Sequence, residues 1–255
     1  MKIGQSMSWS FRRDGLKMRC ENVKLFFFLT LTPYMSTSLI IFAKSPIPGK
    51  VKTRLTPYIT PTEAAELYKA FVADIICNTH KLKCERVTIA YTPSNAEATF
   101  HSICGQSVDY LPQQGHNLGE RMMNAFKYSF DKGSKRTIII GTDSPTLPLS
   151  YVQKAFDALN EVPVTIGPTF DGGYYLIGLS EQNDAIFDGV DWSTSRVFSQ
   201  TLARIQALNK QMYVLPPWYD VDTLDNLEFL RSHIRSMKMS DNSELPYNTM
   251  QFLKV

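Results

Sequence analysis

Short apolar runs alternate with longer amphipathic segments from residue 39 to residue 237. The apolar runs are rich in Ile and Val, which favours buried strands, and the longer segments repeat their apolar residues with the period of a helix. This alternation predicts a mostly parallel sheet whose strands are joined by crossover helices. The predicted strands are residues 39–42, 86–91, 107–111, 137–140, 164–167, 174–179 and 212–214, and the predicted helices are residues 60–81, 95–103, 117–130, 149–159, 197–208 and 224–237.

Local signals refine this pattern at two places. Thr60 with Glu63 three residues later predicts a capping box at the start of the first long helix. The apolar runs at 164–167 and 174–179 are joined through Asp171-Gly172-Gly173, a sequence typical of tight turns. So short a connection predicts a strand that does not run parallel to the rest of the sheet.

The pattern defines one α/β domain over residues 37–237, preceded by an extension at 1–36 and followed by a polar tail at 238–255. In the extension, basic residues precede the apolar run 25–31, which is compatible with a weak secretion signal, an interfacial anchor or a segment outside the fold. The last is favoured because no small-residue cleavage site follows. The run is also far shorter than the roughly 20 residues of a membrane-spanning helix, so no stable membrane span is expected.

Composition narrows the class of partner. The formal net charge is +3 over 255 residues, without the dense Lys/Arg stripe of a nucleic-acid-binding surface, so no nucleic acid is expected. The four cysteines form no C-x-x-C pair, and the sequence contains no N-glycosylation acceptor. A reduced, cytoplasmic location fits these features best.

The loop after the first predicted strand is strongly basic. Its four cations are Lys44, Lys50, Lys52 and Arg54. Gly49 allows the backbone to turn, and Pro46 and Pro48 stiffen it. In an open α/β sheet, ligands bind at the carboxyl ends of the strands, so the position favours phosphate binding. The alternative is a solvated basic loop.

Three aspartates follow other predicted strands. Asp143 comes directly after the apolar run 137–140, where its carboxylate could bind a divalent cation or cap the next helix. Asp222 could be a second metal ligand or the cap of the last long helix. Asp171 could bind the acceptor, a metal or a proton, or belong to a plain turn.

Together these segments resemble a family of bacterial glycosyltransferase-like proteins, the radical-SAM/selenodomain-associated transferase 1 family of the nucleotide-diphospho-sugar transferase superfamily. The resemblance extends over about residues 39–232. It rests on Phe42-Ala43-Lys44, Pro48-Gly49-Lys50-Val51-Lys52-Thr53-Arg54-Leu55, Leu118-Gly119-Glu120-Arg121-Met122, Gly141-Thr142-Asp143, Gly167-Pro168, Asp171-Gly172-Gly173-Tyr174-Tyr175-Leu176-Ile177-Gly178, Trp192-Ser193-Thr194 and Asp220-Val221-Asp222-Thr223.

The resemblance implies a glycosyltransferase-A-like three-layer α/β/α sandwich with a mostly parallel central sheet. It implies that Asp143 takes the position of the family's metal-binding aspartate, with Asp222 as a second candidate ligand for Mg²⁺ or Mn²⁺. The implied donor-binding residues are Lys44, Gly49, Lys52, Arg54 and Arg121, and the implied catalytic residues are Asp143 and Asp171. The chain departs from many relatives in lacking a D-x-D pair at Asp143 and in carrying Asn117 where Asp is expected.

The implied function is transfer of a sugar from a nucleotide-sugar donor to an unidentified acceptor. Two alternatives remain: a nucleotidylyltransferase, in which a phosphorylated acceptor attacks a nucleoside triphosphate and pyrophosphate leaves, and a non-catalytic nucleotide-binding module. The P-loop motif of NTPases does not match, because it requires Gly where Lys44 stands and Ser or Thr where Val51 stands.

Overall fold

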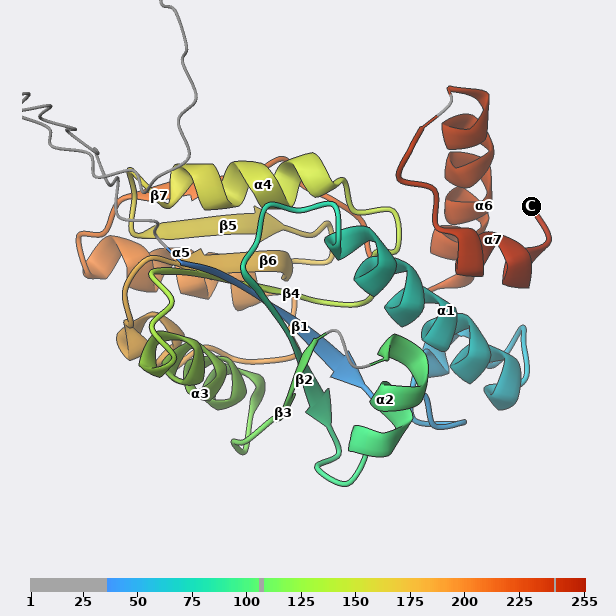
Figure 1. Cartoon of the computed structure of the whole chain (residues 1–255), viewed down its shortest axis with the longest axis horizontal. Coiled ribbons are helices and arrows are strands. Elements are labelled where there is room, and N and C mark those ends of the chain that lie inside the picture. The colour runs from blue at the N-terminus through green and yellow to red at the C-terminus, as the bar shows by residue number, and fades with distance from the viewer. Residues whose placement is uncertain (1–35, 106–107, 241) are drawn as a thin grey trace, which may run out of the picture. The chain divides into compact units, whose positions relative to one another are not determined.

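A computed structural model describes residues 36–105, 108–240 and 242–255. These residues form a seven-stranded sheet with the order β3-β2-β1-β4-β6-β5-β7 (Figure 1). The strands are β1 (Thr37–Lys44), β2 (Arg86–Thr92), β3 (Asp109–Pro112), β4 (Arg136–Ile140), β5 (Val164–Pro168), β6 (Tyr174–Leu179) and β7 (Met212–Val214).

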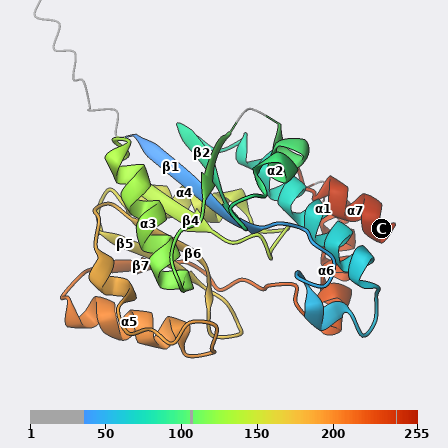
Figure 2. The same ribbon diagram turned by 90° about the horizontal axis from the view of Figure 1, so that it is seen from below.

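Helices cover both faces of the sheet (Figures 1 and 2). The α-helices are α1 (Pro61–Thr79), α2 (Glu97–Cys104), α3 (Leu118–Asp131), α4 (Leu149–Ala158), α5 (Val197–Ala207), α6 (Leu224–Met239) and α7 (Tyr247–Leu253), and the 3₁₀ helices are η1 (Thr53–Leu55) and η2 (Asp184–Phe187). Apolar residues of α1, α2 and α4 pack on one face of the sheet, and those of α3, α5 and η2 pack on the other. The three-layer α/β/α fold predicted from the sequence is therefore confirmed.

The two faces follow from the pleat of the strands. Leu39, Ile41 and Ala43 point into the core beneath α1, whereas Ile40 between them points into the core beneath α3. A strand buried on both faces is apolar on both, which explains the continuous apolar run from Leu39 to Ala43. The capping box predicted at Thr60 and Glu63 is present at the start of α1.

The sheet is mostly parallel, with β6 as the exception. It pairs antiparallel with both β4 and β5, whereas the other neighbouring strands pair in parallel. The non-parallel strand predicted from the short 171–173 connection is therefore confirmed. Because β1 and β4 are parallel neighbours, their carboxyl ends lie together, which brings the loops after Lys44 and Ile140 to the same edge.

The chain after residue 237 differs from the polar tail predicted for 238–255. Helix α6 continues to Met239, and α7 packs against α1 with Leu253 buried. The buried carboxylate of Asp74 on α1 accepts three hydrogen bonds, from the backbone N–H and side-chain Nδ2 of Asn248 and the backbone N–H of Thr249, each 2.8 Å long. The last helix is thus part of the fold. The sequence does not reveal this, because the helix is short and its hydrogen bonds go to a carboxylate far away in the chain.

The predicted extension at 1–36 falls almost entirely outside the described residues, which begin at Ser36. Within the part of the chain that the structure describes, no helix is both long and apolar enough to span a membrane.

Candidate functional site

A cleft of about 440 Å³ opens at the carboxyl ends of β1 and β4. Its walls come from the 44–54 loop, α1, the connection from β3 into α3, the start of β6 and the segment before α6. The lining residues are Phe42, Ala43, Lys44, Lys50, Val51, Lys52, Thr53, Arg54, Tyr68, Gln113, Leu118, Arg121, Gly141, Thr142, Asp143, Tyr174 and Asp222. The structure therefore brings together Lys44, Lys52, Arg54, Arg121, Asp143 and Asp222, which were all predicted as site residues.

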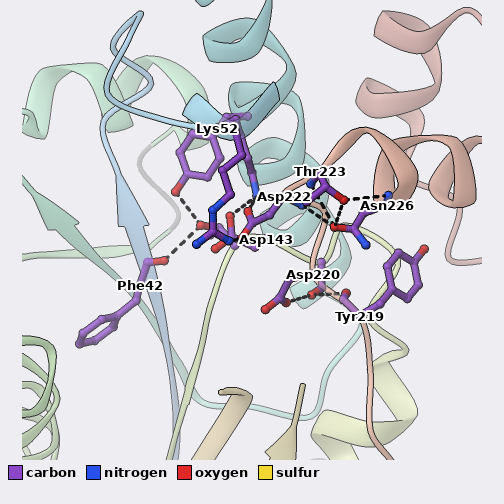
Figure 3. Close-up of polar contacts among 12 residues, drawn as sticks. Phe42, Lys52, Asp143, Tyr219, Asp220, Asp222, Thr223 and Asn226 are labelled. Carbon is purple, nitrogen blue, oxygen red and sulfur yellow. Dashed lines mark hydrogen bonds and ion pairs between the residues drawn. The ribbon is translucent and has the colours of Figure 1, made fainter. Parts of the chain in front are cut away.

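Lys52 lies between the two predicted metal ligands. Its ammonium forms ion pairs with Asp143 and with Asp222, the latter at 3.0 Å between Nζ and Oδ1 (Figure 3). Arg54 makes a longer ion pair with the other oxygen of Asp222, at 3.5 Å. The sequence predicted that Lys52 binds donor phosphate; in this structure its charge is directed at carboxylates instead.

The surroundings of Lys52 are unusual for a lysine. Its side chain is 3% exposed, and the rings of Tyr68 and Phe71 lie 5.9 and 5.5 Å from its nitrogen. Burial by itself would lower the pKa of Lys52, but the charges and hydrogen bonds of Asp143 and Asp222 outweigh it and raise the pKa above its ordinary value. Lys52 is therefore a permanent cation inside the cleft wall.

Local backbone structure fixes both carboxylates. The backbone N–H of Val221 donates to the carbonyl oxygen of Asp143 at 3.0 Å, which ties the segment before α6 to the end of β4. Thr223, not Asp222, caps α6, and its side chain accepts from the backbone N–H of Asn226. Pro148, not Asp143, precedes α4 in the cap position. The helix-capping alternatives for the two aspartates are therefore wrong, and both side chains face the cleft.

The remaining cations of the cleft are uncompensated. Among the described residues, no carboxylate pairs with Lys44, Lys50 or Arg121. Arg121 uses its Nε to donate to the carbonyl oxygen of Gly115 at 3.1 Å, which leaves the terminal guanidinium nitrogens for a ligand. Gly49 has a φ of 76° at the turn of the basic loop, a conformation that favours glycine, and it does not line the cleft itself.

Tyr68 is a cleft residue that the sequence did not identify. Its hydroxyl shares a 2.6 Å hydrogen bond with Thr142 and accepts another from the backbone N–H of Lys44 at 3.0 Å. It thereby ties the end of β1 to the end of β4. Burial, assisted by the charge of Asp143, raises the pKa of Tyr68 to about 12. In the sequence, Tyr68 is one more apolar-face residue of a predicted helix, and no local signal distinguishes it.

Asp220 is a second residue whose role the sequence left unassigned. Its carboxylate accepts a 2.7 Å hydrogen bond from Ser144 (Figure 3). Burial raises the pKa of Asp220 to about 7, with further upward contributions from the charges of Asp143 and Asp171, while Ser144 and Lys52 lower it. The Asp220-Val221-Asp222 pattern was the available signal, because side chains two residues apart in an extended segment point to the same side.

Asp171 lies in the turn between β5 and β6 and does not line the cleft. Its Oδ1 accepts hydrogen bonds from the Thr169 hydroxyl at 2.5 Å and from the backbone N–H of Gly173 at 3.0 Å. These contacts are those of a turn-stabilising aspartate. Its charge nevertheless contributes to the raised pKa of Asp220, after burial and the charge of Asp143.

Comparison with known proteins gives a family and a fold. The model of the family described as "Uncharacterized protein conserved in bacteria (DUF2064)" matches residues 75–194. A protein from Desulfovibrio desulfuricans G20, provisionally named a nucleotide-diphospho-sugar transferase, is 34% identical, with a TM-score of 0.77 over 86% of this chain and 99% of its own. No protein of curated function matches the chain.

More distant solved structures share the fold alone. A cytidylyltransferase from Leptospira borgpetersenii is 12% identical, with a TM-score of 0.53 over 87% of this chain and 94% of its own. A 4-diphosphocytidyl-2C-methyl-D-erythritol synthase from Anaerococcus prevotii is 10% identical, with a TM-score of 0.53 over 78% of this chain and 98% of its own.

Proposed function

Because the chain belongs to the DUF2064 family of bacterial proteins and has the fold of a nucleotide-diphospho-sugar transferase, we propose that it is a transferase that takes a nucleotide-sugar donor and glycosylates an acceptor. One observation carries the proposal: unpaired cations and a pair of carboxylates face the same cleft at the carboxyl ends of β1 and β4. The narrower likeness to the radical-SAM/selenodomain-associated transferase 1 family stays a prediction.

The donor's phosphates are assigned to the basic wall of the cleft. Lys44 and Lys50 supply flexible point charges, and the free nitrogens of Arg121 supply a planar pair of donors suited to phosphate oxygens. Each charge-assisted hydrogen bond to phosphate contributes about 1.5–3 kcal/mol. Arg54 lies at the outer end of this wall and is 71% exposed, so phosphate can approach it from solvent.

The carboxylates suit a divalent cation in donor type. Asp143 and Asp222 supply hard oxygen ligands directed at a common point, and both are partly open to solvent. The described residues contain no group of three or more His, Cys, Asp or Glu side chains in a metal-binding arrangement, so the remaining ligands would come from phosphate and water. Mg²⁺ commonly binds in this way. When bound, Mg²⁺ or Mn²⁺ would neutralise charge on the leaving diphosphate.

In glycosyl transfer, an acceptor hydroxyl attacks the anomeric carbon of the sugar. The bond from that carbon to the phosphate oxygen breaks, and the nucleoside diphosphate leaves with the bonding electrons. The acceptor is assigned to the side of Asp143 that faces Asp220, where Asp171 contributes negative charge at the edge. A carboxylate on this side could accept the acceptor's proton.

Nucleotidyl transfer is the second candidate. The cytidylyltransferase folds of the distant structures motivate it, and the same cations and carboxylates would suit a nucleoside triphosphate. The two reactions differ in their products: glycosyl transfer releases a nucleoside diphosphate, whereas nucleotidyl transfer releases pyrophosphate.

A donor screen read by mass spectrometry tests the proposal. Nucleotide sugars and nucleoside triphosphates are incubated with the protein, Mg²⁺ and a mixture of sugar, lipid and phosphorylated acceptors. We expect a nucleoside diphosphate and a glycosylated product, and we expect Asp143→Asn to lower their formation at least about tenfold by removing one anionic ligand. Release of pyrophosphate would favour the second candidate. Full turnover by Asp143→Asn would contradict the role of Asp143.

A further inference from the structure

The position of Lys52 raises a question that the proposed function leaves open. A lysine near a phosphate site is expected to point at the phosphates, as Lys44 and Lys50 can. Lys52 instead points into the protein and places its ammonium between Asp143 and Asp222 (Figure 3). The ammonium is therefore bonded to the same carboxylate oxygens that a divalent cation would need.

The backbone is arranged to produce this geometry. Lys52 has a left-handed conformation with a φ of 48°, which is uncommon for a residue with a side chain. Its neighbours in the loop, Lys50 and Arg54, have exposed side chains, whereas Lys52 is enclosed by the rings of Tyr68 and Phe71. The enclosure holds the ammonium in place and limits its access to water.

We propose that Lys52 is a built-in counter-cation of the Asp143–Asp222 pair, which holds the two carboxylates together in the free protein and competes with a divalent cation for their oxygens. Lys52 is a positioning residue in this account, because it acts on the carboxylates and not on the reacting atoms. The inference rests on the metal-assisted form of the proposed function.

Charge balance supports the competition. Two carboxylates facing each other repel, and the buried charge of Lys52 changes their joint charge from −2 to −1. The charge of Arg54, 3.5 Å from Asp222, acts from an exposed position and is screened by solvent. A divalent cation is attracted less strongly to a site of charge −1 than to one of −2, and its ligand oxygens must first be released from Lys52. The free protein should therefore bind Mg²⁺ or Mn²⁺ weakly, and the donor's phosphates should strengthen binding by adding negative charge and further ligands.

The first test measures Mn²⁺ binding to the free protein by electron paramagnetic resonance, without donor or acceptor. Lys52→Met removes the charge and keeps a side chain of similar length, and Lys52→Arg keeps the charge. The matched control is Lys50→Met, which removes a cation from the same cleft that touches neither carboxylate. We expect Lys52→Met to bind Mn²⁺ about tenfold more tightly than wild type, with a much smaller change in the other two variants.

Equal gains in Lys52→Met and Lys50→Met would overturn the proposal, because they would reflect the general charge of the cleft. Unchanged or weaker binding by Lys52→Met would overturn it as well. Addition of Asp222→Asn to Lys52→Met should abolish the gain, and a gain that persists would contradict the assigned ligand pair. If no variant binds Mn²⁺, the inference fails, whereas the transferase proposal is judged separately by donor turnover.

The second test uses the wild-type protein and does not depend on how Lys52→Met folds. Lysine labelled with ¹⁵N at Nζ reports on the ammonium by NMR, and the Lys52 signal is identified by its loss in Lys52→Arg. Mg²⁺ added alone should shift this signal as the carboxylate oxygens are shared with the metal. A Lys52 signal that stays unchanged while the carboxyl ¹³C signals of Asp143 and Asp222 move would overturn the proposal.

Discussion

At the scale of single residues, the backbone conformation of the basic loop decides which of its cations face the carboxylates and which face the open cleft. The loop carries cations at residues 44, 50, 52 and 54. Lys52 is buried and pairs with both carboxylates, whereas Arg54 is exposed and reaches Asp222 alone. The left-handed conformation of Lys52 costs roughly 1–2 kcal/mol. The other cations stay on the open side of the cleft. One short loop can thus both hold acidic groups in place and bind an anionic ligand.

Asp220 gives a prediction about stability and pH. Its folded-state pKa of about 7 lies above the ordinary value of 3.8, so between these values the folded protein binds more protons than the unfolded chain. Stability should therefore fall as pH rises from about 4 to about 7 and then level off. Asp220→Asn, which cannot ionise, should lose this contribution and be more stable than wild type at pH 8.

Urea denaturation at several pH values, in the presence of a metal chelator, measures this difference. The control is Asp225→Asn, which removes an exposed carboxylate from the first turn of α6. The assignment to Asp220 would be refuted if the difference in stability between Asp220→Asn and wild type were the same at pH 5 and pH 8.

Part of this site could be predicted from the residues that follow each predicted strand. A cationic loop and Asp143 both follow apolar strands, so their position at the ligand edge could be inferred from the sequence. Tyr68 could not be identified in this way, because its role depends on Thr142, which lies 74 residues later. The inward orientation of Lys52 was equally hidden, because it is determined by one backbone dihedral angle and two distant carboxylates.

At the scale of elements, the strands and long helices were predicted well because each has a strong apolar pattern of its own. The C-terminal helix α7 was missed. It is short, and its attachment to α1 depends on hydrogen bonds from its first residues to the buried carboxylate of Asp74. Such a contact joins positions 174 and 175 residues apart and leaves no periodic signal.

Asp74→Ala should detach α7 from α1. The substitution leaves the N–H groups of Asn248 and Thr249 without their acceptor, and we expect a loss of about 2–3 kcal/mol in the free energy of unfolding. Hydrogen exchange should show faster exchange in residues 247–253 before the sheet opens. The control is Glu66→Ala on the exposed side of the same helix. Unchanged protection of α7 in Asp74→Ala would contradict the anchoring role.

At the scale of the whole described fold, the sheet order creates the cleft. Because β4 pairs directly with β1, the basic loop and Asp143 meet at one edge, and the segment before α6 adds Asp222 to the same place. The sequence predicted parallel strands and one non-parallel strand. It did not predict which strands are neighbours, since strand order depends on packing among elements distant in the chain.

The central claim is that the uncompensated cations of this cleft bind the phosphates of a nucleotide donor. The most direct test is calorimetry with nucleoside diphosphates and the corresponding nucleosides, on wild type and on Lys44→Met/Lys50→Met. The control is Lys83→Met/Lys135→Met, which removes two exposed lysines outside the cleft. We predict that a nucleoside diphosphate binds wild type and the control with equal affinity, and that the corresponding nucleoside binds both at least about tenfold more weakly. In Lys44→Met/Lys50→Met, the affinities for diphosphate and nucleoside should become nearly equal. Equal binding of diphosphate and nucleoside, or undiminished diphosphate binding by the cleft variant, would contradict the claim.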